Sequence, residues 1–259
     1  MGDNVEAMPS GNRKYSVVRL LLLFVILFSS SYIVGRVAAA LPAAVVPSST
    51  ANSYSTNFPH AENPISEGGK WISGKKVGLD WADVAAIPGF AFGTEIGGYR
   101  PAIEKYDDST ALLTGTWGPN QTVEARVHRT NKDNDIACEE VALRLRSSLS
   151  PHNCTGYEVM FRCSKSPRAW CNVARWDGIL GAWLPLKENR GSQYGVADGD
   201  VVKASIKGDT ITVWINAVQI TQARDYLFTK GNPGMGFYIE KITGVNDQYG
   251  FSSFSATSE

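Results

Sequence analysis

From residue 58 onward, the chain consists of short runs in which apolar and polar residues alternate. In 123–128, for example, Val, Ala and Val alternate with Glu, Arg and His, and similar runs occupy 140–146, 157–162 and 210–215. Gly, Pro, Asn and Asp residues separate the runs, and no long stretch shows the spacing of an amphipathic helix. A period of two gives each strand one apolar and one polar face. The pattern therefore predicts an all-β fold, a two-sheet antiparallel sandwich.

The N-terminal 40 residues do not share this pattern. Basic residues precede an apolar core from Leu20 to Phe28, and small residues follow up to Ala40. A positive flank, a short apolar run and small residues are the parts of a secretory signal peptide, so we expect cleavage after Ala40. The alternative is an uncleaved signal anchor over 17–34, which is just long enough to span a bilayer. Either way, we expect the remainder to be secreted, periplasmic or on the cell surface.

The predicted organisation has three parts: a signal peptide or anchor at 1–40, a linker at 41–57, and the β domain at 58–259. The linker is rich in Pro and Ser and has little to bury. The 25 basic and 25 acidic residues cancel, so nothing indicates a nucleic-acid partner. A membrane partner is expected only if the N-terminal segment stays uncleaved.

Charged residues predict how two of the strands pair. If the runs at 140–146 and 157–162 are antiparallel neighbours, Arg144 lies opposite Glu158 and Glu140 lies opposite Arg162. A slip of one residue would place charges on the apolar face, so we expect this register. Trp176 shares the parity of Glu158 across the next hairpin, and we expect it to be partly exposed on the same polar face.

Four cysteines in an exported chain suggest disulfides. We predict a Cys163–Cys171 bond, because the hairpin between them places the two residues opposite each other. Cys138 lies at the same end of the sheet and competes for this pairing, whereas Cys154 lies at the other end. Buried free thiols are the alternative. No Cys-x-x-Cys or His spacing supports a metal site.

Several segments of the C-terminal half resemble the concanavalin A-like lectin/glucanase superfamily, in particular its bacterial jelly-roll members. They occur in the family's order: Gly156-Tyr157-Glu158-Val159, Arg175-Trp176-Asp177-Gly178, Asp198-Gly199-Asp200-Val201-Val202-Lys203, the run from Gly208 to Asn216, the run from Gly231 to Phe237, and Tyr249-Gly250-Phe251. The resemblance implies a jelly-roll sandwich and a polysaccharide or glycan as the partner. It does not define the activity, since this fold hosts lectins, glycosidases and lyases.

The chain departs from the family at one tight turn, where Asn216-Ala217 stands in place of the usual Asn-Gly. Alanine resists the positive φ that glycine accepts. We therefore expect a turn of another type, or one residue longer.

The catalytic patterns of related enzymes are absent. The chain has no Glu-x-Asp-x-x-Glu run of the laminarinase-like glucanases, and Glu124-Ala125-Arg126-Val127-His128 lacks the Gln of the alginate-lyase-like strand. We therefore expect a non-catalytic carbohydrate-binding domain. A lyase or hydrolase with a different catalytic set is one alternative, and a structural or adhesive envelope domain is another.

The candidate carbohydrate contacts are charged and aromatic side chains predicted to share one polar groove on an open sheet face. They are Arg126, His128, Arg144, Glu158, Trp176 and Trp183. Arg and Glu bind sugar hydroxyls or uronate carboxylates, and tryptophan rings stack on the apolar faces of sugar rings. The alternative is a solvated face neutralised by cross-strand ion pairs, with the tryptophans packed in the core.

Two acidic pairs are the candidates for a Ca²⁺ site. Asp107-Asp108 and Asp198-x-Asp200 both occur in loop-like segments, but neither has the spacing of a calcium-binding loop. Such pairs usually form turns. We therefore expect no cofactor, with Ca²⁺ as the alternative.

Overall fold

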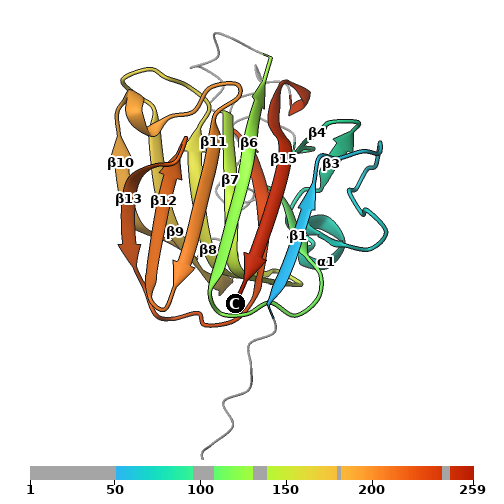
Figure 1. Ribbon diagram of the computed structural model, residues 1–259. Helices are drawn as coiled ribbons and strands as arrows, with labels where there is room; N and C mark the ends of the chain where they lie inside the picture. The colour runs from blue at the N-terminus through green and yellow to red at the C-terminus, as the bar shows by residue number, and fades with distance from the viewer. Residues whose placement is uncertain (1–50, 96–107, 131–138, 180–181, 241–245) are drawn as a thin grey trace, which may run out of the picture. The chain divides into compact units, whose positions relative to one another are not determined.

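The computed structural model describes residues 51–95, 108–130, 139–179, 182–240 and 246–259. These residues form two antiparallel sheets, as the alternation of apolar and polar residues predicts (Figure 1). The sheet that faces the viewer in Figure 1 is called the front sheet below, and the other is called the back sheet.

The front sheet is built around the C-terminal strand. In spatial order its strands are β13 (Val218–Arg224), β12 (Thr210–Ile215), β11 (Val201–Lys207), β6 (Gln121–Arg129), β15 (Tyr249–Ser258), β4 (Phe90–Gly93) and β3 (Val84–Ile87), and β1 (Asn52–Thr56) pairs with β15.

The back sheet contains the two longest hairpins. Its strands are β10 (Trp183–Arg190), β9 (Trp170–Ile179), β8 (Asn153–Arg162), β7 (Glu139–Ser150), β14 (Asn232–Ile239), β5 (Ser109–Leu113) and β2 (Trp71–Ser73). In the described ranges, three short helical turns connect strands: α1 (Gly74–Gly78), η2 (Ser192–Tyr194) and η3 (Asn246–Gln248).

One hydrophobic core lies between the sheets. It includes Val123, Ala125 and Val127 from the front sheet and Leu143 and Val159 from the back sheet, all fully buried. Because successive side chains of a strand point to opposite sides, the polar residues between these positions project from the two outer faces of the sandwich.

The predicted register of β7 and β8 is confirmed. Arg144 pairs with Glu158, Glu140 pairs with Arg162, and both strands turn their apolar residues toward the core. The cross-strand charge pairs therefore lie on the outer face of the back sheet.

The sandwich begins earlier than residue 58, inside the predicted linker. Residues 52–56 form β1, in which Asn52 pairs with Ser258 of β15. Tyr54 packs inward, with its ring 5.5 Å from that of Trp71. The segment looks like a linker because the positions beside Tyr54 are serines.

The Asn216-Ala217 turn is a two-residue turn, so the prediction of another type or a longer loop was wrong. Ile215 pairs with Val218, and the φ angles are 51° at Asn216 and 64° at Ala217, as a type I′ turn requires. The Asn216 side chain accepts a hydrogen bond from the Val201 amide and donates one to Asp200, each at 2.8 Å. These bonds hold alanine in a conformation that it disfavours.

The predicted Cys163–Cys171 disulfide is not formed. Cys171 pairs with Phe161, two residues before Cys163, so the cysteines are not opposite each other. Both thiols are free and fully buried in the core, and Cys154 is also free and buried. Cys138 lies outside the described residues.

Among the described residues, no helix is long and apolar enough to cross a bilayer. The predicted signal peptide or anchor lies outside the described part of the chain.

Candidate functional site

The six predicted contact residues do not share one groove. Arg126 and His128 lie on β6 of the front sheet, whereas the other four belong to β7, β8, β9 and β10 of the back sheet. The sandwich core separates these outer faces, so the prediction of a single polar groove was wrong. Side-chain parity indicates which face of its own sheet a residue occupies, but not in which sheet its strand lies.

On the back sheet, Arg144 and Glu158 form a buried ion pair. Arg144 Nη2 lies 2.9 Å from Glu158 Oε1, and the two side chains are 0% and 2% exposed. Arg144 Nη2 also donates to Thr110 Oγ1 at 3.1 Å, and Trp176 Nε1 donates to Glu158 Oε2 at 2.7 Å. Both carboxylate oxygens of Glu158 are therefore occupied by protein donors.

Trp176 is buried, so the prediction that it is partly exposed was wrong. Its ring packs edge-on against Trp81 at 4.8 Å, and the Arg144 guanidinium carbon lies 5.6 Å from the Trp176 ring and 5.4 Å from the Trp81 ring. Trp81 follows α1, and His152 Nδ1 contacts Asp80 at 2.8 Å beside it. The segment after α1 thus covers this end of the face, which parity within one hairpin does not reveal.

A glycine makes room for the ion pair. A Cβ atom added to Gly236 of β14 would lie 3.3 Å from Arg144 Nε and 3.4 Å from Glu158 Oε1. A larger residue would therefore press on the pair. Glycine therefore leaves room for the guanidinium beside the Glu158 carboxylate and the Trp81 and Trp176 rings, where cation–π attraction adds to the ion pair.

Beside this buried network, two half-buried tryptophans lie on the same face. Trp170 of β9 and Trp183 of β10 both pack on a cluster formed by Ala142, Met160 and Ala174. These tryptophans, together with Asn172, are called the aromatic face below. Trp183 is the one predicted contact residue of the back sheet that is not buried.

Asn172 is the polar member of the aromatic face. It lies two residues from Trp170 on β9, with Met160 opposite on β8 and Glu188 opposite on β10. Its Oδ1 atom is buried and, among the described residues, meets no hydrogen-bond donor. A buried acceptor without a donor costs about 1–3 kcal/mol, so this atom favours a ligand that supplies one.

Sequence reasoning missed Trp170, Asn172 and Trp81. Trp170 lies between Cys163 and Cys171, where the sequence predicts the turn of a hairpin, although it shares the parity of Trp176. Starting the strand one residue earlier would have placed Trp170 on this face, where Asn172 already lies by the same parity. The position of Trp81 depends on how the segment after α1 folds back, for which the sequence holds no comparable signal.

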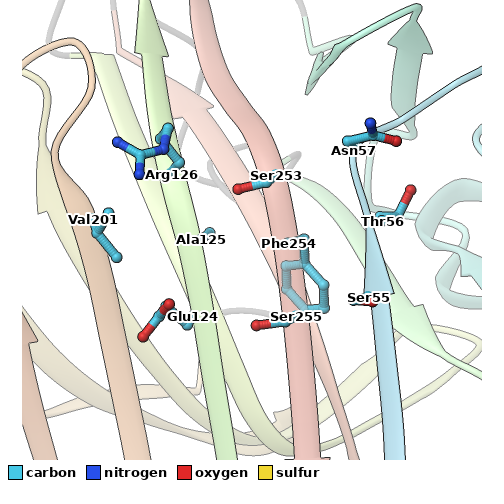
Figure 2. Close-up of a pocket in the computed structure, with 10 residues that line it drawn as sticks. All are labelled: Ser55, Thr56, Asn57, Glu124, Ala125, Arg126, Val201, Ser253, Phe254 and Ser255. Carbon is cyan, nitrogen blue, oxygen red and sulfur yellow. The ribbon is translucent and has the colours of Figure 1, made fainter.

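The outer face of the front sheet carries a polar hollow, called the front groove below (Figure 2). Its volume is about 390 Å³, and it is lined by residues of β1, β6, β11 and β15 and by Asn57 just after β1: Ser55, Thr56, Asn57, Glu124, Ala125, Arg126, Val201, Ser253, Phe254 and Ser255. In Figure 2, Glu124 and Arg126 on β6 lie between Val201 of β11 and the two serines of β15.

His128 continues the row of Arg126 along β6 but does not line the groove. Its ring packs edge-on against Phe90 at 4.6 Å, and its Nδ1 lies 3.5 Å from Asp198 Oδ1. These contacts give the histidine a packing role.

No cluster of three or more metal-ligating side chains occurs among the described residues. Asp200 instead pairs with Lys165 at 2.8 Å and accepts hydrogen bonds from Asn216 and the Ala197 amide. Asp107 of the other acidic pair lies outside the described residues.

The sequence matches no protein-family model and no curated protein. Among solved structures, the metal-free carbohydrate recognition domain of Emp46p aligns with a TM-score of 0.53 at 12% identity, over 78% of this chain and 95% of that one. Its potassium-bound form gives 0.51 at 11% identity, over 78% and 94%. A 1,3-α-1,4-β-D-galactose-4-sulfate-3,6-anhydro-D-galactose 4 galactohydrolase gives 0.51 at 10% identity, over 84% and 98%.

These similarities show the fold. The chain has the fold of these proteins, an antiparallel two-sheet jelly-roll sandwich, as the sequence segments indicated.

Proposed function

We propose that this chain is a carbohydrate-binding β-sandwich domain and that the aromatic face of the back sheet contacts the glycan. The observation that carries the proposal is the pair of half-buried tryptophans, Trp170 and Trp183, on one small-residue floor with Asn172. The similarity of the fold to the carbohydrate recognition domain of Emp46p supports it.

The chemistry of the aromatic face suits a sugar. Tryptophan rings offer apolar surfaces on which the C–H faces of sugar rings stack. Asn172 is partly exposed, and a turn of its side chain would bring the unpaired Oδ1 to a sugar hydroxyl and orient the ring. Ala142, Met160 and Ala174 form an apolar floor that supports the two tryptophan rings.

The buried network acts as a support for this surface. Arg144, Glu158 and Trp176 are held by one another and by Trp81. They are buried and do not contact the glycan directly, but they keep the aromatic face rigid. A rigid surface loses less conformational entropy on binding. Of the predicted contact residues on the back sheet, Trp183 is assigned the direct contact.

The arrangement favours binding over hydrolysis. Glycoside hydrolysis needs a pair of carboxyl groups that face the scissile bond. Glu158 faces Arg144 and Trp176 with its two oxygens, and its side chain is 2% exposed. Glu158 therefore has a structural role, as the acceptor of hydrogen bonds from Arg144 and Trp176.

We also propose that the domain acts outside the cytoplasm, as a secreted, periplasmic or surface protein. The basic flank, the apolar run from Leu20 to Phe28 and the small residues up to Ala40 support this localisation.

The test of the binding site compares three aromatic variants of the full chain. Affinity electrophoresis against soluble xylan, mixed-linkage glucan, laminarin, galactomannan and alginate identifies a bound polymer. Trp170→Ala and Trp183→Ala should each weaken binding to it about 10-fold or more, with unchanged far-ultraviolet circular dichroism.

The matched control is Tyr226→Ala, which removes an aromatic side chain that is 84% exposed after β13. It should bind like the parent. Equal affinity of all three variants and the parent would exclude the aromatic face, and retention of no polysaccharide would count against the carbohydrate function itself.

A further inference from the structure

We propose that the front groove is a second, independent carbohydrate site that takes a neutral oligosaccharide lying across β1, β15, β6 and β11. It goes beyond the proposed function, because it lies on the opposite outer face of the sandwich and does not use the tryptophans of the aromatic face.

The first support is shape. The front groove has a volume of about 390 Å³, and an adjoining hollow of about 260 Å³ shares Glu124 and Val201 with it and reaches Lys203, Asn216 and Ala217. Sites for small ligands usually measure roughly 300–1,000 Å³. The two hollows together therefore suit a ligand longer than a single sugar ring.

The second support is the order of polar groups along the floor. The strand registers place Ser255, Glu124 and Lys203 in one row across β15, β6 and β11, and Ser253 and Arg126 in the next row. Neighbouring strands lie about 4.8 Å apart, so each row offers a new polar group at that interval.

The two rows bring hydrogen-bond acceptors and hydrogen-bond donors next to each other. A carboxylate only accepts hydrogen bonds, guanidinium and ammonium groups only donate them, and serine hydroxyls do both. The hydroxyls of a sugar also donate and accept. A polyol can therefore satisfy Glu124, Arg126 and the serines together, whereas an apolar peptide segment would leave them unpaired.

The third support is that the charged groups are held in place. Arg126 Nη1 donates to the Gly199 carbonyl at 2.8 Å, and Lys203 Nζ lies 4.9 Å from the centre of the Trp214 ring. Each cation keeps N–H groups for a ligand. Within the described residues, the exposed Glu124 carboxylate has no hydrogen-bond or ion-pair partner, so it is available as an acceptor.

The opposite charges of the floor partly cancel, and its one carboxylate disfavours an acidic group at the centre of the row. Glu124 lies directly across from Lys203 and two residues from Arg126, so its negative charge occupies the middle of the row. An acidic group of a ligand would meet this carboxylate at close range. A neutral ligand meets no such repulsion and uses all three charged groups as hydrogen-bond partners.

The two sites are structurally independent. Ala125, between Glu124 and Arg126, is buried in the core that separates the two sheets. Occupation of one outer face therefore leaves the other free. A domain with two sites can bind one polymer twice or link two polymers, which raises avidity without new contacts.

The test uses isothermal titration of the full chain with cellohexaose, xylohexaose, laminarihexaose and mannohexaose, and with a hexamer of galacturonate as the acidic comparison. The Trp170→Ala/Trp183→Ala background removes the aromatic face. This variant should still bind a neutral hexaose, and Glu124→Gln/Arg126→Gln added to it should weaken binding at least 10-fold. The matched control is Lys207→Gln/Glu259→Gln, which removes an exposed pair of the same charges at the end of β11 and should change nothing.

Three outcomes overturn the proposal. It fails if the groove substitutions leave binding unchanged, if only the galacturonate hexamer binds, or if no hexaose binds the tryptophan background. Loss of all binding in the tryptophan background would leave the proposed function standing with a single site. Binding that depends only on Glu124 and Arg126 would instead support the groove and exclude the aromatic face.

Discussion

Glu158→Gln tests whether the Arg144–Glu158 pair is buried as described. The substitution keeps the shape of the side chain and an acceptor for Trp176, but it removes the negative charge. Arg144 is then left 0% exposed, with Asp108 at 3.9 Å as its nearest other carboxylate. Loss of one partner of a buried pair costs about 3–5 kcal/mol of unfolding free energy. The residual attraction to Asp108 lowers the expected cost to about 3 kcal/mol.

Urea unfolding followed by tryptophan fluorescence measures this cost. With a denaturant slope of about 2–3 kcal/mol per M, the midpoint should fall by about 1 M or more. The matched control is Lys207→Gln, which breaks the pair with Glu259 at 3.3 Å, where the side chains are 68% and 67% exposed. It should cost at most about 0.5–1 kcal/mol.

A double substitution separates charge burial from packing. Arg144→Met/Glu158→Leu removes both charges, and its stability should lie within about 1 kcal/mol of the parent, since replacing a buried pair by apolar residues is often neutral. The reasoning is refuted if Glu158→Gln costs no more than the Lys207→Gln control. That result would mean that solvent reaches the Arg144 guanidinium.

Three further measurements follow from burial and from the N-terminal sequence. Burial raises the pKa of Glu140 well above its usual range, so the folded state keeps a proton that the unfolded state releases. The free energy of unfolding should therefore fall as the pH rises above about 4.5. Urea unfolding at pH 5 and pH 8 should show this fall in the parent and not in Glu140→Gln. In a Cys138→Ser background, Ellman's reagent should label none of the three described thiols in the folded protein and all three after unfolding. The folded thiols resist labelling because burial raises the pKa of Cys154 to about 12 and the pKa values of Cys163 and Cys171 further. Labelling of only one thiol after unfolding would reveal the disulfide. Sequencing of the exported protein should start near Leu41, and a chain that still starts at Met1 would support the anchor.

The features that could be predicted from the sequence are those set within one strand or between the two strands of one hairpin. The period of two defined the sandwich, and the charges at Arg144 and Glu158 defined the register of β7 and β8. Both are local properties, since a wrong register would bury charge in the core.

The burial of a side chain and the sheet to which a strand belongs depend on segments far away in the sequence, and these features could not be predicted. Parity placed Trp176 beside Glu158 correctly, but its burial depends on Trp81, which arrives from a segment about a hundred residues away in the sequence. The same limit explains why Arg126 was grouped with the charges of the back sheet, although β6 pairs with β11 and β15. The pairing of strands far apart in the chain decides which polar faces meet.

The pairing of β1 with β15 brings the two ends of the described sandwich to the same edge, where Asn52 lies opposite Ser258 (Figure 1). A short Gly/Ser peptide can therefore join these ends without crossing either outer face. New termini can then be opened at the exposed Asn216-Ala217 turn, giving a circular permutant with the same strand pairing. By the same geometry, the sandwich can be inserted into a surface loop of a host protein, which would hold it by one edge and leave both outer faces accessible.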